Sequence, residues 1–149
     1  MQFINTNSRI IKWLLIFTVS VFLTTPLVGV ADIAMIVHKD SSLSDVRIKD
    51  VKLLYLGKRK KIGGIRTIPV SLPTLSQAAK QFSTLVLSKT PKQLKAYWTG
   101  LVFTGKGAPP PVLDSPQAIK QWIVENPEGM AFIDSNDVDD SVSVAATYK

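Results

Sequence analysis

Short apolar runs alternate with segments of helical spacing along most of this chain, and this alternation is what most restricts its fold. Ile33–Val37 and Met130–Ile133 are apolar runs of the length that buried strands have. From Lys49 onward, apolar residues recur at spacings of three and four, which predicts a helix with one buried face. The whole pattern predicts an α/β domain with a mostly parallel or mixed sheet of about four strands and helices packed on it.

The expected elements follow from the same patterns along the chain. The predicted strands are Ile33–Val37, Ile65–Leu72, Met130–Ile133 and Val142–Ala145. The apolar residues that predict the helices are Ile48, Val51, Leu54 and Tyr55; Ala78, Phe82, Leu85 and Val86; Leu94, Tyr97, Trp98, Leu101 and Val102; and Ala118, Ile119, Trp122 and Ile123.

Residues with special backbone preferences mark where these elements begin and end. Thr90 and Ser115 each precede a proline, a pair typical of an N-cap followed by the first helical residue. Gly57 is expected just beyond the end of the first helix, because glycine adopts left-handed geometry without a Cβ clash. Pro127 stops the last helix. Pro69 has no amide donor, so its strand is expected at a sheet edge or a strand end.

The N-terminal segment has the order of features of a secretory signal peptide. Arg9 and Lys12 precede the apolar run Trp13–Leu23, which is shorter than the roughly 20 residues needed to span a bilayer. Small residues, Gly29 and Ala31, stand where a signal peptidase requires them. We therefore expect residues 1–31 to be a signal peptide and residues 32–149 to be one mature domain in the bacterial periplasm; the alternative is a retained membrane anchor.

Composition restricts the functions that this chain can have. It has no cysteine, which excludes a disulfide framework, a thiolate metal site and a lipid-anchored lipoprotein. Its net charge of +7 suits nucleic acid, anionic lipid or a small anion, and export argues against nucleic acid. No phosphate loop, nucleophile elbow or carboxylate pair stands out, so we expect neither an enzyme nor a cofactor. The acidic loop Asp134–Asp140 lacks the glycine and the final glutamate of a calcium loop, so no metal is expected.

Several short sequence motifs, in a fixed order, resemble those of one protein family. They are Leu54-Tyr55-Leu56-Gly57-Lys58 with the basic turn to Lys61, then Phe103-Thr104-Gly105-Lys106-Gly107, then Asn126-Pro127-Glu128-Gly129 with the strand to Ile133. Together they resemble the PstS-like phosphate-binding proteins of ABC transporters. The resemblance implies a single lobe of a type II periplasmic-binding-protein-like fold, as in the short relatives of this family, whose longer members close two lobes on the anion.

The resemblance also implies where a ligand would bind, and there the chain departs from the pattern. The family has an arginine and a Gly-Ser-Gly-Thr-like stretch after the second strand; the corresponding segment here, Val70–Ser76, keeps only the hydroxyls of Ser71, Thr74 and Ser76. These three residues are the candidate phosphate ligands, because a helix N-terminus offers free amides and a positive dipole end. The alternative is that Thr74 or Ser76 only caps the following helix.

Two functions from different classes follow from these observations. The first is weak binding of phosphate or a similar oxyanion, or an accessory role in phosphate ABC transport, with an ABC permease or another periplasmic protein as partner. One open lobe desolvates an anion poorly, so a homodimer could supply the second wall. The second function is a ligand-free protein-interaction module derived from a solute-binding lobe. The basic turn Lys58–Lys61 would steer anions or contact phospholipid in one interpretation and be a solvated turn in the other.

Overall fold

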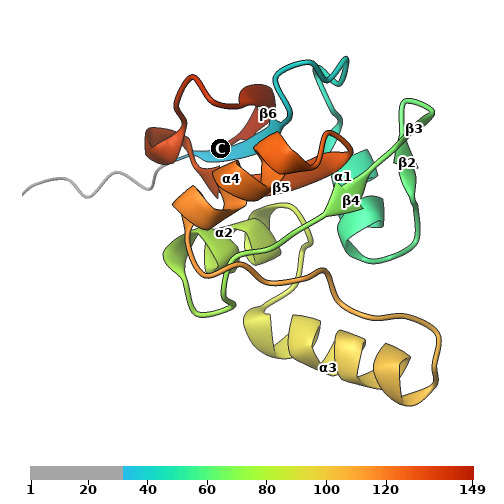
Figure 1. Cartoon of the computed structure of the whole chain (residues 1–149). Helices are drawn as coiled ribbons and strands as arrows, with labels where there is room; N and C mark the ends of the chain where they lie inside the picture. Colours follow the sequence, from blue (N-terminus) through green and yellow to red (C-terminus); the bar gives the residue numbers. More distant parts are fainter. Residues whose placement is uncertain (1–31) are drawn as a thin grey trace, which may run out of the picture.

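The structure, a computed structural model, describes residues 32–149 (Figure 1). The predicted signal peptide, residues 1–31, lies outside the described residues. No helix among the described residues is long and apolar enough to cross a membrane. In chain order the elements are β1 (Ile33–Val37), α1 (Ile48–Tyr55), β2 (Lys61–Ile62), β3 (Ile65–Arg66), β4 (Ile68–Pro69), α2 (Gln77–Leu85), α3 (Pro91–Phe103), α4 (Pro116–Glu125), β5 (Gly129–Asp134), the 3-10 helix η1 (Ser135–Asp137) and β6 (Ser143–Tyr148).

The main sheet has four strands in the order β4-β5-β1-β6. β1 lies in the interior of the sheet and pairs antiparallel with β5 and with β6, whereas β4 pairs parallel with β5. The predicted α/β class and mixed sheet are confirmed, and the sheet is not mostly parallel. β4 lies at the edge, as the missing amide of Pro69 predicted.

The predicted strand Ile65–Leu72 is wrong as a single element, because the structure divides it. Gly63 and Gly64 have φ angles of 57° and 85°, the left-handed geometry of a tight hairpin turn, so β2 pairs with β3 in a small separate hairpin. The chain then passes into β4 at Ile68. Ser71 forms an isolated parallel bridge with Val112.

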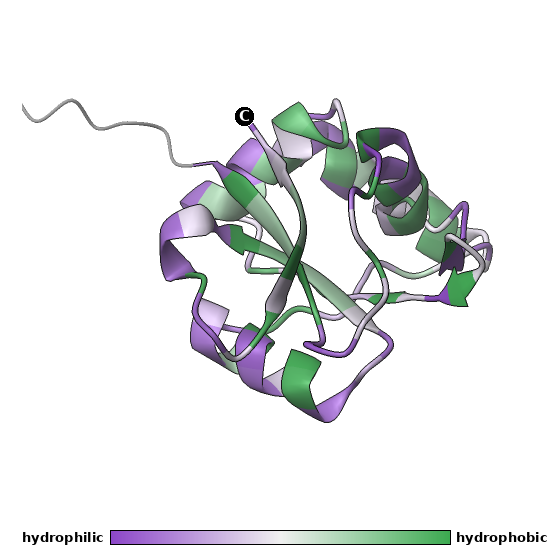
Figure 2. Cartoon of the chain, turned by 90° about the horizontal axis from the view of Figure 1, so that it is seen from above, coloured by the Kyte–Doolittle hydropathy of each residue, from purple (hydrophilic) through white to green (hydrophobic). Residues whose placement is uncertain are grey.

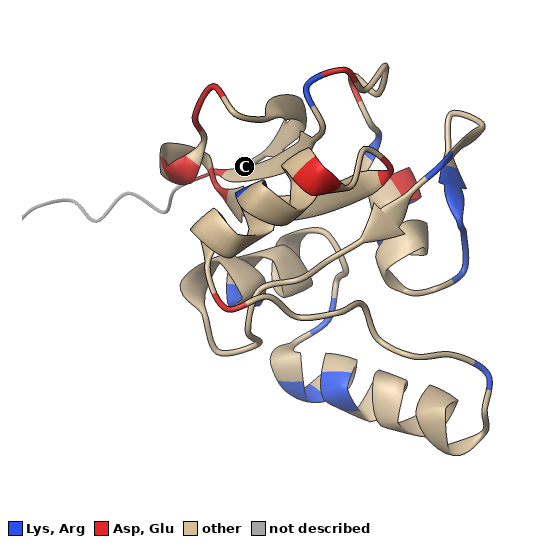
Figure 3. Ribbon diagram, viewed as in Figure 1, with Lys and Arg blue, Asp and Glu red and all other residues tan. Residues whose placement is uncertain are grey.

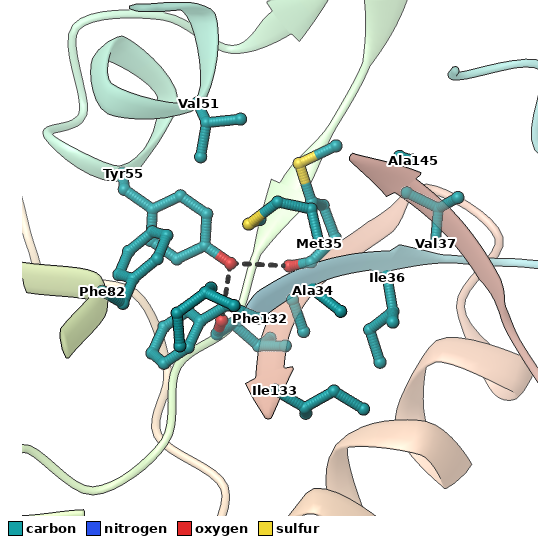
Figure 4. Close-up of a cluster of buried hydrophobic side chains, with 14 of the residues drawn as sticks. Ala34, Met35, Ile36, Val37, Val51, Tyr55, Phe82, Phe132, Ile133 and Ala145 are labelled. Atoms are coloured by element: carbon teal, nitrogen blue, oxygen red, sulfur yellow. Dashed lines mark hydrogen bonds between the residues drawn. The ribbon is translucent and has the colours of Figure 1, made fainter. Parts of the chain in front are cut away.

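Helices cover both faces of the sheet, so the strands β1 and β5 are buried on both sides. β1 is buried throughout, and β5 is buried up to Ile133. Figure 2 shows hydrophobic residues in the strands at the centre of the domain. Met35 and Val37 lie on the side of Val51 and Tyr55 from α1, whereas Ile36 and Ile133 point to the opposite face, toward α4 (Figure 4). Such two-sided burial explains why these strands are continuous apolar runs in the sequence.

Capping residues fix the helix ends as the sequence predicted. The Thr90 hydroxyl accepts a hydrogen bond from the Gln93 amide, the Gln93 side chain accepts one from the Thr90 amide, and the Ser115 hydroxyl accepts one from the Ala118 amide. After α1, the Gly57 amide donates to Leu54 and the Lys58 amide donates to Leu53, a Schellman motif. Ile48, expected in the buried stripe of α1, is 41% exposed at the first position of the helix.

Replacing Gly57 by alanine should lower the free energy of unfolding by about 1–2 kcal/mol, because its φ of 68° is left-handed. The added Cβ would also lie 3.2 Å from Cη2 of Trp98. At Gly100, inside α3, an added Cβ would meet nothing within 4 Å. Gly100→Ala is therefore the matched control and should stabilise the protein by about 1 kcal/mol. Urea denaturation of both variants measures the difference, and equal effects would contradict this account of Gly57.

Candidate functional site

The three candidate phosphate residues lie between the edge strand β4 and the start of α2. The backbone of Ser71 is held by hydrogen bonds to Pro111 and from Leu113, each 2.9 Å long. The hydroxyl of Ser71 donates to the carbonyl of Leu72 at 3.1 Å. Thr74 lies in the exposed turn that follows. Ser71 and Thr74 both line one large groove, whose residues do not include Ser76.

Ser76 is the N-cap of α2. Its hydroxyl accepts a hydrogen bond from the Ala79 amide at 3.2 Å, and its amide donates to Pro73 at 2.9 Å. This is the capping geometry weighed as the alternative from the sequence. The Ser76 hydroxyl therefore has an intramolecular partner already, and an oxyanion at this end of α2 would depend on Thr74 and on the backbone amides of the first helical turn.

A groove with a cavity volume of about 950 Å³ opens between α3 and the main body of the domain. On one side it is lined by α3 residues, and on the other by the turn before α2, by α2 itself and by the connector after α3. Most of the lining is apolar. Leu75, Phe82 and Leu87 contribute from the body, Leu94 and Trp98 from α3, and Pro109 and Pro110 from the connector. This size and composition suit a binding site rather than a packing defect.

Three aromatic rings form the floor of this groove. Phe82 stacks on Phe132 with ring centroids 4.0 Å apart and planes 5° apart, and Tyr55 meets Phe82 edge-on at 4.7 Å. The Tyr55 hydroxyl donates toward two buried carbonyl groups, those of Val70 at 2.9 Å and Met130 at 3.1 Å (Figure 4). Burial raises the pKa of Tyr55 well above its usual value. The floor is therefore rigid and uncharged, and suits an apolar occupant.

The rim of the groove exposes large apolar side chains to solvent. Leu75 is 80% exposed, Phe103 is 91% exposed, and Val102 and Val112 are each more than half exposed. In α3 only Trp98 is buried, although its apolar residues at helical spacing are typical of a core helix. Figure 1 shows why: α3 lies at the bottom of the view, away from the strands of the sheet.

Sequence reasoning did not find this groove, because its walls come from segments far apart in the chain. One signal was available, because two apolar residues belong to no buried stripe. Leu75 lies just before α2, and Phe103 is the last residue of α3.

Charges are divided between two parts of the molecule. No acidic residue occurs from Val51 to Leu113, which contains both hairpin strands, α2 and α3. Acidic residues occur in the segment from just before β1 to α1 and from just before α4 to the loop before β6, whereas the charged residues of α3 are all basic (Figure 3). Lys92 and Lys95 of α3 line the groove, and Lys89 lies 5.4 Å from the ring centroid of Tyr97.

Part of the predicted basic turn is used for internal pairing. Arg59 forms an ion pair with Asp50 of α1, and Arg47 donates to the same carboxylate at 2.9 Å. The hydrogen bond from Arg47, with the charges of Arg47 and Arg59, lowers the pKa of Asp50. Lys58 and Lys60 remain exposed in the turn. Arg59 thus ties the turn to α1, while the lysines keep the turn basic on its outer side.

The acidic loop also has internal partners. Asp134 caps η1 by accepting a hydrogen bond from the Asn136 amide at 2.8 Å. Asp139 pairs with Lys120 of α4, and hydrogen bonds from Lys120 and Ser141 lower the pKa of Asp139. Within residues 32–149, no group of three or more histidine, aspartate or glutamate side chains could hold a metal ion.

Two solved structures have this fold. One is an ABC-type phosphate transport receptor from Vibrio cholerae, with a TM-score of 0.59, 17% identity, and alignment over 77% of this chain and 46% of the receptor. The other is a putative phosphate ABC transporter substrate-binding protein with bound phosphate from Clostridium perfringens, with a TM-score of 0.61, 24% identity, and alignment over 78% of this chain and 45% of that protein. The chain therefore has a PstS-like fold, that of a single lobe of a periplasmic-binding protein.

The chain spans less than half the length of both of these proteins. The rest of each solved structure, more than half of its length, lies outside the alignment. No protein-family model and no curated protein matches this sequence. The similarity thus defines the fold, which the order of the sequence motifs had predicted correctly.

Proposed function

We propose that this chain is an exported, non-enzymatic domain that binds phosphate or a similar oxyanion weakly and serves as an accessory in phosphate transport. The observation that carries the proposal is the fold shared with two phosphate-transport proteins, one of which holds phosphate. The signal-peptide pattern of residues 1–31 supports a periplasmic location. An ABC permease or another periplasmic protein is the expected partner, and a nucleic acid is not.

The proposed oxyanion site is the junction formed by Ser71, Thr74 and Ser76. It combines the exposed hydroxyl of Thr74 with the first amides of α2, a helix of nine residues. Weak binding is expected for two reasons. The arginine that the family resemblance implies is missing, and the junction opens to solvent, where an anion keeps much of its hydration. Closure by a second copy of the chain would improve the affinity.

Calorimetry with inorganic phosphate tests this site. We expect a Kd of about 1 mM, which corresponds to about −4 kcal/mol. A double variant, Thr74→Val with Ser76→Asp, should weaken binding at least about tenfold, because aspartate preserves the cap while its charge repels phosphate. Thr147→Val, at an exposed position of β6, is the control. Absence of heat and of a thermal shift at millimolar phosphate would reject the proposal, and unchanged affinity in the double variant would move the site elsewhere.

The second candidate function is a protein-interaction module that has lost its ligand. The specific observation in its favour is the apolar groove with Leu75 and Phe103 at its rim, since exposed apolar surface of this kind is typical of interaction sites. Pull-down of the same partner with and without phosphate would favour this function. A partner retained only when phosphate is present would favour the first.

A further inference from the structure

Two helical stripes face each other across the groove. On α3 the stripe is Leu94, Trp98 and Val102, at spacings of four residues, and on the other side it is Leu75, Ala79 and Phe82. Such spacing places the first set on one side of α3 and places Ala79 and Phe82 on one side of α2, with Leu75 in the turn before α2. Trp98, Ala79 and Phe82 are already buried in the domain, whereas Leu75 and Val102 are 80% and 55% exposed, so each stripe ends in an apolar side chain that the domain leaves uncovered.

The dimensions of the groove suit a third helix. α3 has 13 residues, so at about 1.5 Å per residue its groove wall is about 20 Å long. The cavity of about 950 Å³ is open to solvent along this wall and is bordered by Leu75, Phe103, Val102 and Val112. A helix laid into an apolar groove buries such rim residues as well as the floor, which a small ligand on the floor would leave exposed.

The charge around the groove selects the kind of helix. Lys92 and Lys95 belong to the lining, Lys89 precedes α3 and Lys106 follows it, and no acidic residue occurs anywhere between Val51 and Leu113. A partner with acidic residues beside its apolar stripe would be attracted, and one with basic residues would be repelled.

No helix among residues 32–149 fits this description. Residues 1–31 contain Arg9 and Lys12 but no acidic residue, so their charge has the wrong sign. A second copy that presented its own α3 would bring lysines against lysines. Among the described helices, α1 carries Asp50, already paired with two arginines, and α4 carries only Glu125 as an acidic residue.

We propose that the groove between α3 and α2 binds an amphipathic helix of another protein, with an apolar stripe flanked by aspartate or glutamate. This inference rests on the interaction function given as the second candidate, and does not depend on phosphate binding. Its anchors are the exposed apolar side chains of Leu75, Val102 and Phe103. Lys92 and Lys95 provide the charge selection.

Selection from a displayed peptide library tests the proposal. Peptides of about 14 residues, helical and about 20 Å long, would carry a fixed leucine stripe at spacings of three and four, with flanking positions randomised among glutamate, glutamine and lysine. We expect glutamate to be enriched over lysine beside the stripe. No enrichment, or equal enrichment of lysine, would overturn the proposal.

The selected peptide is then measured against variants by fluorescence anisotropy. Leu75→Glu with Phe103→Glu should weaken binding at least tenfold, since both residues are exposed and their replacement leaves the core intact. Val124→Glu, on an exposed position of α4 outside the groove, should bind as the parent does. Lys92→Glu with Lys95→Glu should reverse the preference from glutamate to lysine peptides. Equal binding by all variants would overturn the proposal.

Two further measurements separate this inference from its alternatives. Peptide binding is measured without phosphate, and phosphate binding is measured without peptide, so failure of the phosphate site and failure of the groove are seen independently. Stronger, Phe103-dependent binding to phosphatidylglycerol vesicles than to the peptide would replace the helix by a membrane. Self-association in sedimentation that the Leu75 and Phe103 double variant abolishes would replace it by a second copy.

Discussion

Replacing Phe132 by alanine should lower the free energy of unfolding by about 3–5 kcal/mol, the largest effect expected of any truncation in the core. The ring is 1% exposed in the middle of β5, stacks on Phe82 and meets Tyr55 at 5.9 Å. Its removal deletes aromatic contacts that join the sheet to α1 and α2. Because the ring is also part of the groove floor, the cavity left behind joins the groove.

Urea denaturation followed by circular dichroism measures this loss, provided that the transition is two-state. Phe103→Ala is the matched control, since it removes the same ring from a position that is 91% exposed, and it should change the free energy of unfolding by less than about 0.5 kcal/mol. Similar losses in the two variants would mean that the aromatic floor does not hold the domain together.

The sequence was sufficient to predict helix ends and buried strands that are determined by residues within the element or next to it. Thr90 and Ser115 fixed helix starts through their own side chains, and Gly57 fixed a helix end through its left-handed backbone. β1 and β5 were recognisable because burial on both faces demands an unbroken apolar run. The two Gly-Lys motifs, Gly57-Lys58 and Gly105-Lys106, led to the correct fold, although neither motif forms part of the candidate oxyanion site.

One error concerns a local turn, and one omission concerns residues that are far apart in the sequence. The run Ile65–Leu72 has strand composition throughout, but the turn at Gly63 and Gly64 pulls its first residues into a separate hairpin. The groove is a greater omission. Its walls come from α2, α3 and the connector, and periodicity alone does not show that α3 has one partner fewer than its apolar residues require.

Prediction of the candidate oxyanion site from the sequence was limited in a similar way. Hydroxyls at Ser71, Thr74 and Ser76 can be read from the sequence, but their hydrogen-bond partners cannot. The structure assigns the Ser76 hydroxyl to the cap of α2 and the Ser71 hydroxyl to a neighbouring carbonyl. Thr74, the most exposed of the three, is therefore the residue on which the phosphate proposal most depends.

Replacing Gly129 by alanine should also destabilise the domain strongly, by about 3 kcal/mol, because overpacking a closed site forces neighbouring atoms to move. A Cβ at this position would lie 2.5 Å from Cζ3 of Trp122, 2.8 Å from Cδ1 of Ile123 and 2.9 Å from the carbonyl oxygen of Asn126. Ile123 is fully buried, and the Asn126 carbonyl accepts a hydrogen bond from the Gly129 amide itself at 2.8 Å. Neither can move without separating α4 from β5.

A double-mutant cycle distinguishes this steric cause from a backbone cause. Trp122→Leu removes the ring atoms nearest to the new Cβ, so it should recover about 1 kcal/mol or more of the loss in the Gly129→Ala background, a coupling typical of residues in contact. On its own, Trp122→Leu should destabilise the protein, because the half-buried ring packs against the core. Additive losses in the double variant would show that the Ile123 side chain or the Asn126 carbonyl, rather than the indole ring, sets the requirement for glycine where α4 turns into β5.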